Sequence, residues 1–278
     1  MRPMVLNAFL IVLAIYGALV GSLYLFQRSL IYHPGHAALS PAEVGLNHMG
    51  VLRLETSEGL VAVSWYGAPD EGAPVVVYFQ GNAGTIADRA HKVRPYLERG
   101  FGVLLVGYRG YGANEGKPSE AGLVADGRAA LGFLQGEGIA PARWVLYGES
   151  IGSGVAVELA REQAVDRSAP VGAVVLEAPF TSLVDMGRAL YPFAPISLLL
   201  KDRFESLTKI AAIKAPLVVV HGSLDLVVPQ TQGQRLFEAA EAPKTFFLVD
   251  GAGHNNLYDF GAEGRILGFL APLLAPGR

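Results

Sequence analysis

The chain contains six short, nearly uninterrupted apolar runs. They are Val75–Phe79, Val103–Val106, Trp144–Tyr147, Ala173–Leu176, Leu217–Val220 and Thr245–Val249. Continuous apolar runs, rather than alternation with polar residues, indicate strands that are buried on both faces, as in a parallel sheet. Helices are expected between and after the runs, over residues 85–99, 119–135, 152–164, 230–241 and 255–274. The pattern predicts one α/β domain with a mostly parallel central sheet flanked by helices.

Two further segments extend this plan. Val51–Thr56 and Leu60–Tyr66 alternate around a Ser-Glu-Gly turn, which predicts a hairpin. About forty residues separate the apolar runs that end near Glu177 and begin at Leu217. Part of this interval, about 180–210, is either a short cap over a site or a packed excursion. If the segment is a cap, the residues expected to line an acyl-binding site are Tyr191, Phe193, Ile196 and Leu199.

The N-terminus carries an uncharged stretch of 23 residues, 4–26. As a helix it would be about 35 Å long, enough to cross a hydrocarbon core of about 30 Å. We expect a single-pass membrane anchor within residues 1–28 and a catalytic domain over 29–278. A cleaved signal peptide or a buried core helix are the alternatives. Residues 27–50 are expected to form a connector, and the short N-terminal tail favours a domain outside the cytoplasm.

Composition narrows the possible functions. The 278 residues include no cysteine, which excludes disulfides, thiolate metal sites and a cysteine nucleophile. The net charge is −3 and no block of basic residues occurs, so nucleic-acid binding has no electrostatic support. Neither a metal nor a cofactor is expected, and the oligomeric state is left open.

The sequence Gly-Glu-Ser-Ile-Gly at 148–152 directly follows one predicted strand and directly precedes a predicted helix. The G-x-S-x-G motif alone is weak, but a nucleophile elbow requires this strand, sharp turn and helix. Ser150 is therefore the candidate nucleophile. The alternative is an ordinary loop with a helix-capping serine. Ser153 lacks the flanking glycines and should lie inside the helix.

A serine nucleophile needs a base, and the base needs an orienting acid. His254 lies in a glycine-rich loop after the last predicted strand, whereas His221 ends a strand and is expected to be structural. Asp225 follows the preceding strand, and Asp202 in the cap segment is its alternative. Ser150, Asp225 and His254 then follow the chain order of α/β-hydrolases.

The oxyanion formed during attack needs hydrogen-bond donors. Ile151 would offer one backbone N–H. Asn82 or Ala83 would offer the second, from the loop Gly81–Thr85 after the first buried strand. A phosphate-binding loop is excluded here, because no lysine follows the glycines and their spacing does not fit.

With these residues assembled, the chain resembles the α/β-hydrolase superfamily, and more narrowly the single-pass, membrane-anchored abhydrolase proteins related to protein depalmitoylases. The matches are the anchor followed by FQRSLIYHP, then GNAG, YRGYG, GKPSE, GESIG, HGSLDLVVP and GAGHNN. The resemblance implies the α/β-hydrolase fold, a triad of Ser150, Asp225 and His254, and ester or thioester hydrolysis without a cofactor. No cysteine-rich N-terminal tract occurs, unlike in eukaryotic depalmitoylases, so a small-molecule or lipid acyl ester is the expected substrate.

The sequence thus predicts a membrane-anchored serine hydrolase that cleaves acyl esters through an acyl-enzyme. Its partners would be an acyl ester or thioester substrate and the bilayer around residues 4–26. A protein or acyl thioesterase uses the same residues and is one alternative. A catalytically inactive, anchored interaction module is an alternative of another class, although such a module has no need of a complete triad.

Overall fold

The computed structural model describes residues 2–241 and 243–274. Within them, the main sheet has eight strands in the spatial order β10-β9-β8-β7-β4-β6-β3-β2. These are β2 (Gly50–Glu55), β3 (Val61–Gly67), β4 (Val75–Phe79), β6 (Gly102–Val106), β7 (Trp144–Glu149), β8 (Ala173–Glu177), β9 (Leu217–Gly222) and β10 (Lys244–Val249). All pairs from β10 to β6 are parallel, and β3 is antiparallel to both β6 and β2. The predicted parallel sheet and the hairpin are confirmed.

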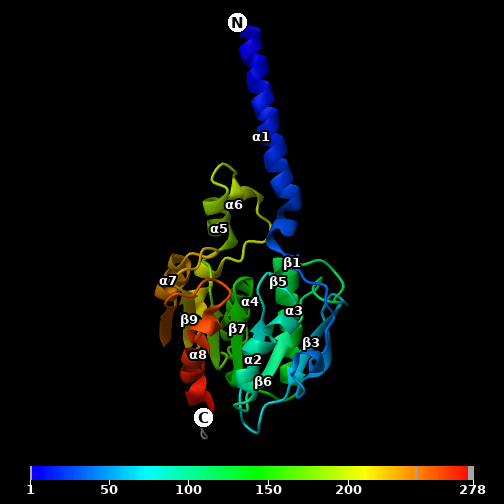
Figure 1. Cartoon of the computed structure of the whole chain (residues 1–278), viewed down its shortest axis with the longest axis vertical. Helices are drawn as coiled ribbons and strands as arrows, with labels where there is room; N and C mark the ends of the chain where they lie inside the picture. The colour runs from blue at the N-terminus through cyan, green and yellow to red at the C-terminus, as the bar shows by residue number, and fades with distance from the viewer. Residues whose placement is uncertain (1, 242, 275–278) are drawn as a thin grey trace.

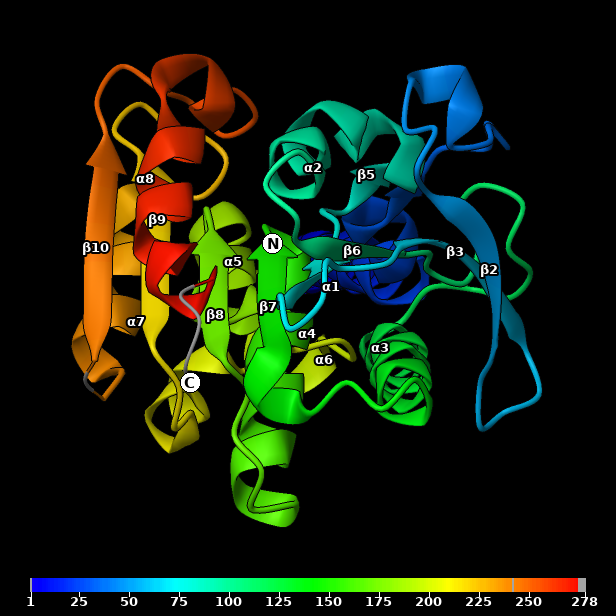
Figure 2. The same cartoon turned by 90° about the horizontal axis from the view of Figure 1, so that it is seen from below.

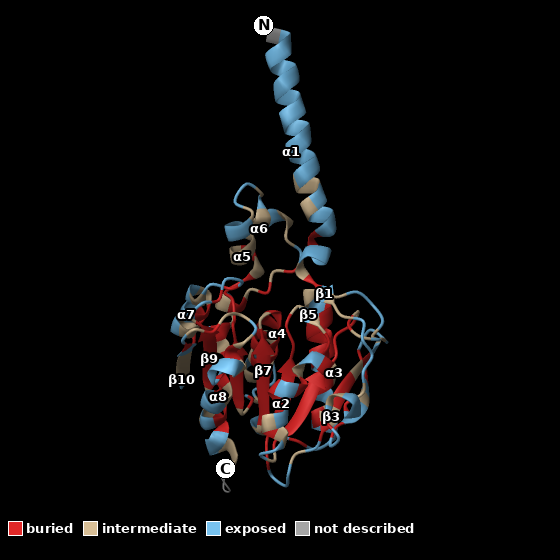
Figure 3. Ribbon diagram, in the orientation of Figure 1, coloured by how far each residue is buried: buried red, intermediate tan, exposed pale blue. Residues whose placement is uncertain are grey.

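Helices cover both faces of the sheet (Figures 1 and 2). One face carries α3 (Glu120–Gly136), α4 (Ile151–Arg161) and α7 (Gln230–Ala239), and the other carries α2 (Ala90–Leu97) and α8 (Ala262–Leu270). Side chains of β4 alternate between the two layers: Val77 and Phe79 pack on the first face, and Val76 and Tyr78 on the second. The sheet is buried throughout its middle (Figure 3), which explains five of the six apolar runs in the sequence. The sixth run forms β10, an edge strand that is mostly half-buried, so the expectation of burial on both faces is wrong there.

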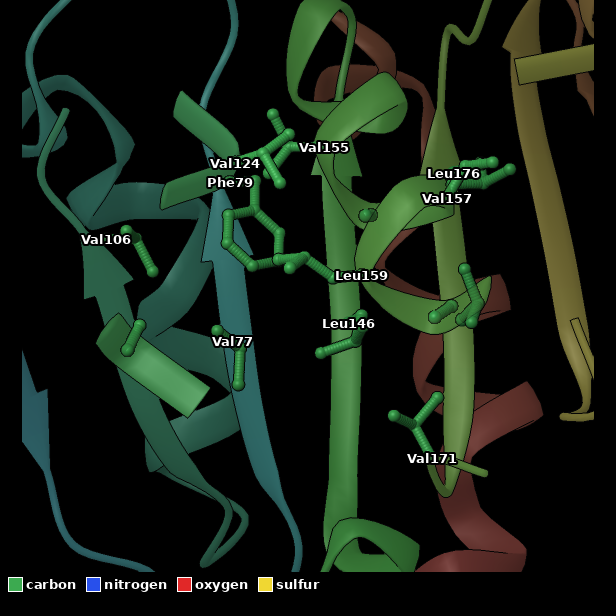
Figure 4. Packing of buried hydrophobic residues seen from close by; sticks show 14 of the residues in the cluster. Val77, Phe79, Val106, Val124, Leu146, Val155, Val157, Leu159, Val171 and Leu176 are labelled. Atoms are coloured by element: carbon green, nitrogen blue, oxygen red, sulfur yellow. The ribbon is translucent and has the colours of Figure 1, made fainter. Parts of the chain in front are cut away.

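Close packing holds α3 and α4 against β4. Figure 4 shows Phe79 of β4 lying against Val155 and Leu159 of α4. Gly127 of α3 faces the same spot, where an added Cβ would lie 2.6 Å from Leu159 Cδ1 and 3.0 Å from Phe79 Cε1. The helices can approach this closely because Gly127 has no side chain.

The N-terminal helix α1 (Arg2–Ile31) leaves the domain as an exposed rod (Figures 1 and 3). Its residues Pro3–Ile31 are long and apolar enough to cross a membrane, judged by length and composition. The helix ends at Ile31, so the prediction of a connector beginning at residue 27 is wrong for its first five residues. The helix continues because residues 27–31 contain no proline or glycine, and the next of these in the chain are Pro34 and Gly35.

The segment between β8 and β9 lies beside the lower part of α1 (Figure 1) and contains α5 (Leu183–Leu190) and α6 (Ile196–Leu199). We refer to residues 180–210 as the cap. Two short strands, β1 (His33–Pro34) and β5 (Ala83–Gly84), form a separate parallel pair between the end of α1 and the loop after β4.

Three predicted helices have different limits in the structure. Residues 257–260 form a 3-10 turn, and α8 begins only at Ala262 because Gly261 adopts a left-handed conformation with φ 83°. Ile86–Arg89 is likewise a 3-10 turn ahead of α2. The helix expected to end at 164 changes after Arg161 to a π-helical turn over Glu162–Asp166.

Two glycines of α3 provide a matched test of this packing. Gly127→Ala should lower the free energy of unfolding by about 1–3 kcal/mol, because the new methyl group overpacks the Phe79–Leu159 contact. A Cβ added at Gly132 has no atom within 4 Å. Gly132→Ala should therefore raise the free energy of unfolding by up to about 1 kcal/mol, because alanine has the higher helix propensity. Denaturant titration of the purified variants measures both, and equal effects of the two substitutions would contradict the packing account.

Candidate active site

Ser150 lies in the sharp turn between β7 and α4, as predicted. Its backbone has φ 51° and ψ −117°, a conformation that costs a non-glycine residue about 1–3 kcal/mol. Hydrogen bonds hold this strained residue: its N–H donates to Glu177 O at 2.9 Å. Its carbonyl oxygen accepts from Ser153 N at 2.9 Å and from Ser153 Oγ at 2.6 Å. Ser153 is therefore a buried helix residue that supports the turn, as the sequence predicted.

The two glycines of the motif are required by space. A Cβ on Gly152 would lie 2.1 Å from Phe79 O, and one on Gly148 would lie 2.5 Å from Gly152 O. Both clashes are with backbone, which cannot move aside as a side chain can. The glycines thus allow the start of α4 to approach β4 and bring Ser150 to the carboxyl end of the sheet.

The structure brings Ser150, His254 and Asp225 together. His254 Nε2 lies 3.0 Å from Ser150 Oγ, and His254 Nδ1 lies 2.7 Å from Asp225 Oδ2. Asp225 lies in the loop after β9, and His254 lies in the loop after β10. A backbone hydrogen bond of 2.9 Å from Leu224 N to Ala252 O connects the two loops. A proton can pass from the serine to the imidazole at these distances.

The side chain of Asp225 is buried, and hydrogen-bond donors contact both of its oxygens. Its Oδ1 accepts from Val227 N at 2.9 Å and from Val228 N at 2.8 Å. Burial by itself would raise the pKa of Asp225, but hydrogen bonds from His221 and His254 hold that pKa well below its usual range. Asp225 is therefore ionised at neutral pH and can fix the orientation of His254.

His221 lies behind this carboxylate, in a contact that the sequence analysis missed. Its buried Nε2 is 2.8 Å from Val228 O and 3.4 Å from Asp225 Oδ2. The sequence feature that could have indicated this contact is the position of His221, near the end of β9 and four residues before Asp225. Asp202, the alternative acid, lies elsewhere and pairs with Arg28 at 2.8 Å.

Of the three residues predicted to stabilise an oxyanion, Asn82 and Ile151 line the same cavity as Ser150. Ile151 is the first residue of α4, where backbone N–H groups have no intrahelical acceptor. The Asn82 side-chain amide donates to Ile31 O at 2.9 Å. The backbone carbonyl oxygen of Asn82 accepts from Tyr111 Oη at 2.7 Å. Ala83 belongs to β5, paired with His33, and is not among the described residues that line the cavity.

A buried group of charged residues lies beneath the turn, and the sequence analysis did not anticipate it. Arg89 Nη2 pairs with Glu149 Oε1 at 2.8 Å, and Lys92 Nζ pairs with Glu177 Oε1 at 2.7 Å and with Glu149 Oε2 at 3.4 Å. Tyr78 Oη also donates to Glu149 Oε2, at 2.6 Å. Burial would raise the pKa of Glu149, but Lys92 and Arg89 lower that pKa below its usual range. Glu149 and Glu177 end two neighbouring strands, so this group joins both strands to α2.

The cavity above Ser150 has a volume of about 300 Å³ and is mostly apolar. Of the four cap residues predicted to line an acyl site, Tyr191 and Ile196 line this cavity. Phe193 and Leu199 are not among the described residues in its wall: Phe193 is half exposed at the cap tip, and Leu199 uses its carbonyl to accept from Gln27. Other cap residues line the wall: Leu183, Met186, Leu190 and Leu200. Within residues 2–241 and 243–274, no group of three acidic or histidine side chains could hold a metal ion.

The sequence and the fold were compared with those of known proteins. No family model matches the chain. An uncharacterized protein of Mycobacterium tuberculosis is 41% identical over 233 residues, which cover 83% of this chain and 81% of that protein. The α/β-hydrolase domain-containing protein WAV2 of Arabidopsis thaliana is 32% identical over 270 residues, covering 88% and 86%. The lysophosphatidylserine lipase ABHD12 of Danio rerio is 29% identical over 241 residues, covering 74% of this chain and 62% of that protein.

Among solved structures, an esterase from Pyrococcus furiosus superposes with a TM-score of 0.67 at 19% identity, covering 88% of this chain and 99% of the esterase. This likeness confirms the fold. The chain therefore belongs to the α/β-hydrolase superfamily, and it is a hydrolase of the serine esterase and lipase type.

The buried charges beneath Ser150 predict a particular pH dependence. Glu149→Gln should lower the free energy of unfolding at pH 7 by about 3–5 kcal/mol, because Lys92 and Arg89 lose a buried partner. The lowered pKa of Glu149 means that its contribution is complete above pH ~4.5 and is lost as the pH falls through the folded-state value. The difference from wild type should therefore shrink between pH 5 and pH 3.

Denaturant titrations at several pH values measure this difference. Glu71→Gln, in an exposed turn, is the control and should change stability by less than about 0.5 kcal/mol at every pH. A gap between wild type and Glu149→Gln that stays constant with pH would show that Glu149 is not held ionised by its neighbours.

Proposed function

We propose that the chain is a membrane-anchored esterase that cleaves acyl esters with Ser150 as nucleophile, His254 as base and Asp225 as orienting acid. The observation that carries the proposal is the continuous hydrogen-bond chain from Ser150 Oγ through His254 to Asp225. Catalysis by a serine hydrolase requires a serine that is hydrogen-bonded to an imidazole. That imidazole must in turn be hydrogen-bonded to a carboxylate, and here the serine lies in a strained turn and the carboxylate is buried.

In the proposed reaction Ser150 Oγ attacks the ester carbonyl carbon while its proton passes to His254 Nε2. The backbone N–H groups of Ile151 and Asn82 stabilise the resulting oxyanion. The C–O bond to the alcohol then breaks, and the alcohol leaves with the proton from His254. Water then attacks the acyl-serine carbonyl and gives a proton to His254. The bond to Ser150 Oγ breaks, His254 passes this proton to Ser150, and the carboxylic acid is released.

The apolar cavity supports an acyl chain as the part of the substrate bound beside Ser150. The named activities of ABHD12, a lipase, and of the Pyrococcus furiosus protein, an esterase, support the same choice. We further propose residues 4–26 of α1 as a single-pass anchor, residues 29–278 as the catalytic domain and residues 180–210 as its cap.

A fluorophosphonate probe tests the nucleophile directly, because it bonds covalently to an activated serine. Wild-type protein in detergent should be labelled, and Ser150→Ala should not. Ser57→Ala, in the exposed hairpin turn, should be labelled like wild type. Asp225→Asn should be labelled at least about 100-fold more slowly, since His254 loses its orienting acceptor.

Folding of each variant is checked by its thermal unfolding. Folded wild-type protein that resists the probe would remove the proposal and favour an anchored interaction module instead. Unchanged labelling of Ser150→Ala would place the reactive serine elsewhere in the chain.

A further inference from the structure

One wall of the cavity above Ser150 comes from the N-terminal helix itself. Leu23, Gln27, Leu30 and Ile31 of α1 line the cavity, opposite the cap residues Met186 and Tyr191. The four α1 positions are spaced as i, i+4, i+7 and i+8, so they lie on one face of the helix. The cavity thus lies between α1 and the cap, and Ser150 is among the residues that line it.

Several polar contacts fix α1 in this position. Gln27 Nε2 donates to Leu199 O at 3.2 Å, and Gln27 Oε1 accepts from Lys201 N at 2.7 Å. Arg28 makes two bonds to Asp202, of 2.8 and 3.0 Å, and Asp202 is itself buried. Since Ile31 O also accepts from the side chain of Asn82, the end of the helix is hydrogen-bonded to the proposed oxyanion loop.

The length of α1 locates the cavity relative to a bilayer. Pro3–Ile31 would be about 43 Å long, whereas a hydrocarbon core is about 30 Å thick and takes about 20 residues. A core filled from Pro3 would end near Ser22, so Leu23 and the following turns emerge at the membrane surface. The cavity wall therefore lies at the level of the lipid headgroups and ester groups.

The cap tip lies deeper. Tyr16 Oη donates to Phe193 O at 2.9 Å, and Tyr16 is six residues, or about 9 Å, inside that limit. Three large apolar side chains of the cap are exposed here: Leu190 (66%), Phe193 (49%) and Leu198 (83%). Exposed apolar groups beside a membrane-crossing helix are stable when hydrocarbon surrounds them.

Building on the proposed function, we propose that α1 is a substrate-binding wall as well as an anchor. The substrate is a long-chain acyl ester resident in the bilayer, and its chain enters sideways between α1 and the cap. Leu23 and Leu30 contact that chain and determine which lengths are accepted. A short, water-soluble ester needs no such contact to reach Ser150.

The test compares hydrolysis of 4-nitrophenyl butyrate and 4-nitrophenyl palmitate by the full chain reconstituted in phosphatidylcholine vesicles. Leu23→Trp fills the gap between α1 and the cap. It should lower the palmitate-to-butyrate ratio of kcat/KM at least tenfold. Leu30→Trp should act in the same direction.

Leu25→Trp is the matched control, because Leu25 is 73% exposed and is not among the described residues that line the cavity. It should leave the ratio unchanged. Each variant is also labelled with the fluorophosphonate probe, which reports on Ser150 independently of the acyl chain. Normal labelling with an unchanged ratio in both Leu23→Trp and Leu30→Trp would overturn the inference while the proposed function stands.

A wild-type protein that hydrolyses butyrate but not palmitate in vesicles would overturn it as well. A wild-type protein that neither reacts with the probe nor cleaves either ester would instead overturn the proposed function, and this inference with it. If Leu23→Trp alone loses labelling, Leu23→Ala replaces it: the widened gap should then shift the chain-length preference, and an unshifted preference would contradict the inference.

Discussion

The strained, positive-φ backbone at Ser150 is the constraint on which the candidate site depends. A strand can turn into a helix within one residue only if the helix starts almost in contact with the neighbouring strand. Gly148 and Gly152 permit that contact, and bonds to Glu177 O and from Ser153 stabilise the strained residue. The position of Ser150 then determines where the loops after β9 and β10 must bring Asp225 and His254.

The site is supported from two directions. Beneath it, Arg89 and Lys92 pair with two carboxylates at the ends of the adjacent strands β7 and β8, so neither buried charge is left without a partner. Above it, α1 and the cap line the apolar cavity. Paired charges beneath Ser150 and an apolar cavity above it suit the proposed cleavage of acyl esters.

Much of the fold could be predicted from the sequence, because five buried strands and the apolar edge strand β10 leave a strong apolar signal. The same holds for Ser150, Asp225 and His254, whose positions after strands or in glycine-rich turns are local features. Contacts between distant segments could not be predicted in this way. Neither the pairing of Lys92 with Glu177 nor that of Gln27 with the cap leaves a mark on nearby residues. Phe193 and Leu199 are as apolar as the true wall residues, and only the packing of α1 on the cap decides which side chains face inward.

The rigid attachment of α1 to the domain has a mechanical consequence. A helix longer than the hydrocarbon thickness commonly tilts to match it. Here the helix cannot tilt alone, because Gln27 and Arg28 tie it to the cap and Ile31 is tied to Asn82. In a bilayer that α1 spans, the globular part would therefore tilt with the helix. Bilayer thickness would thereby set the angle at which the domain meets its lipids.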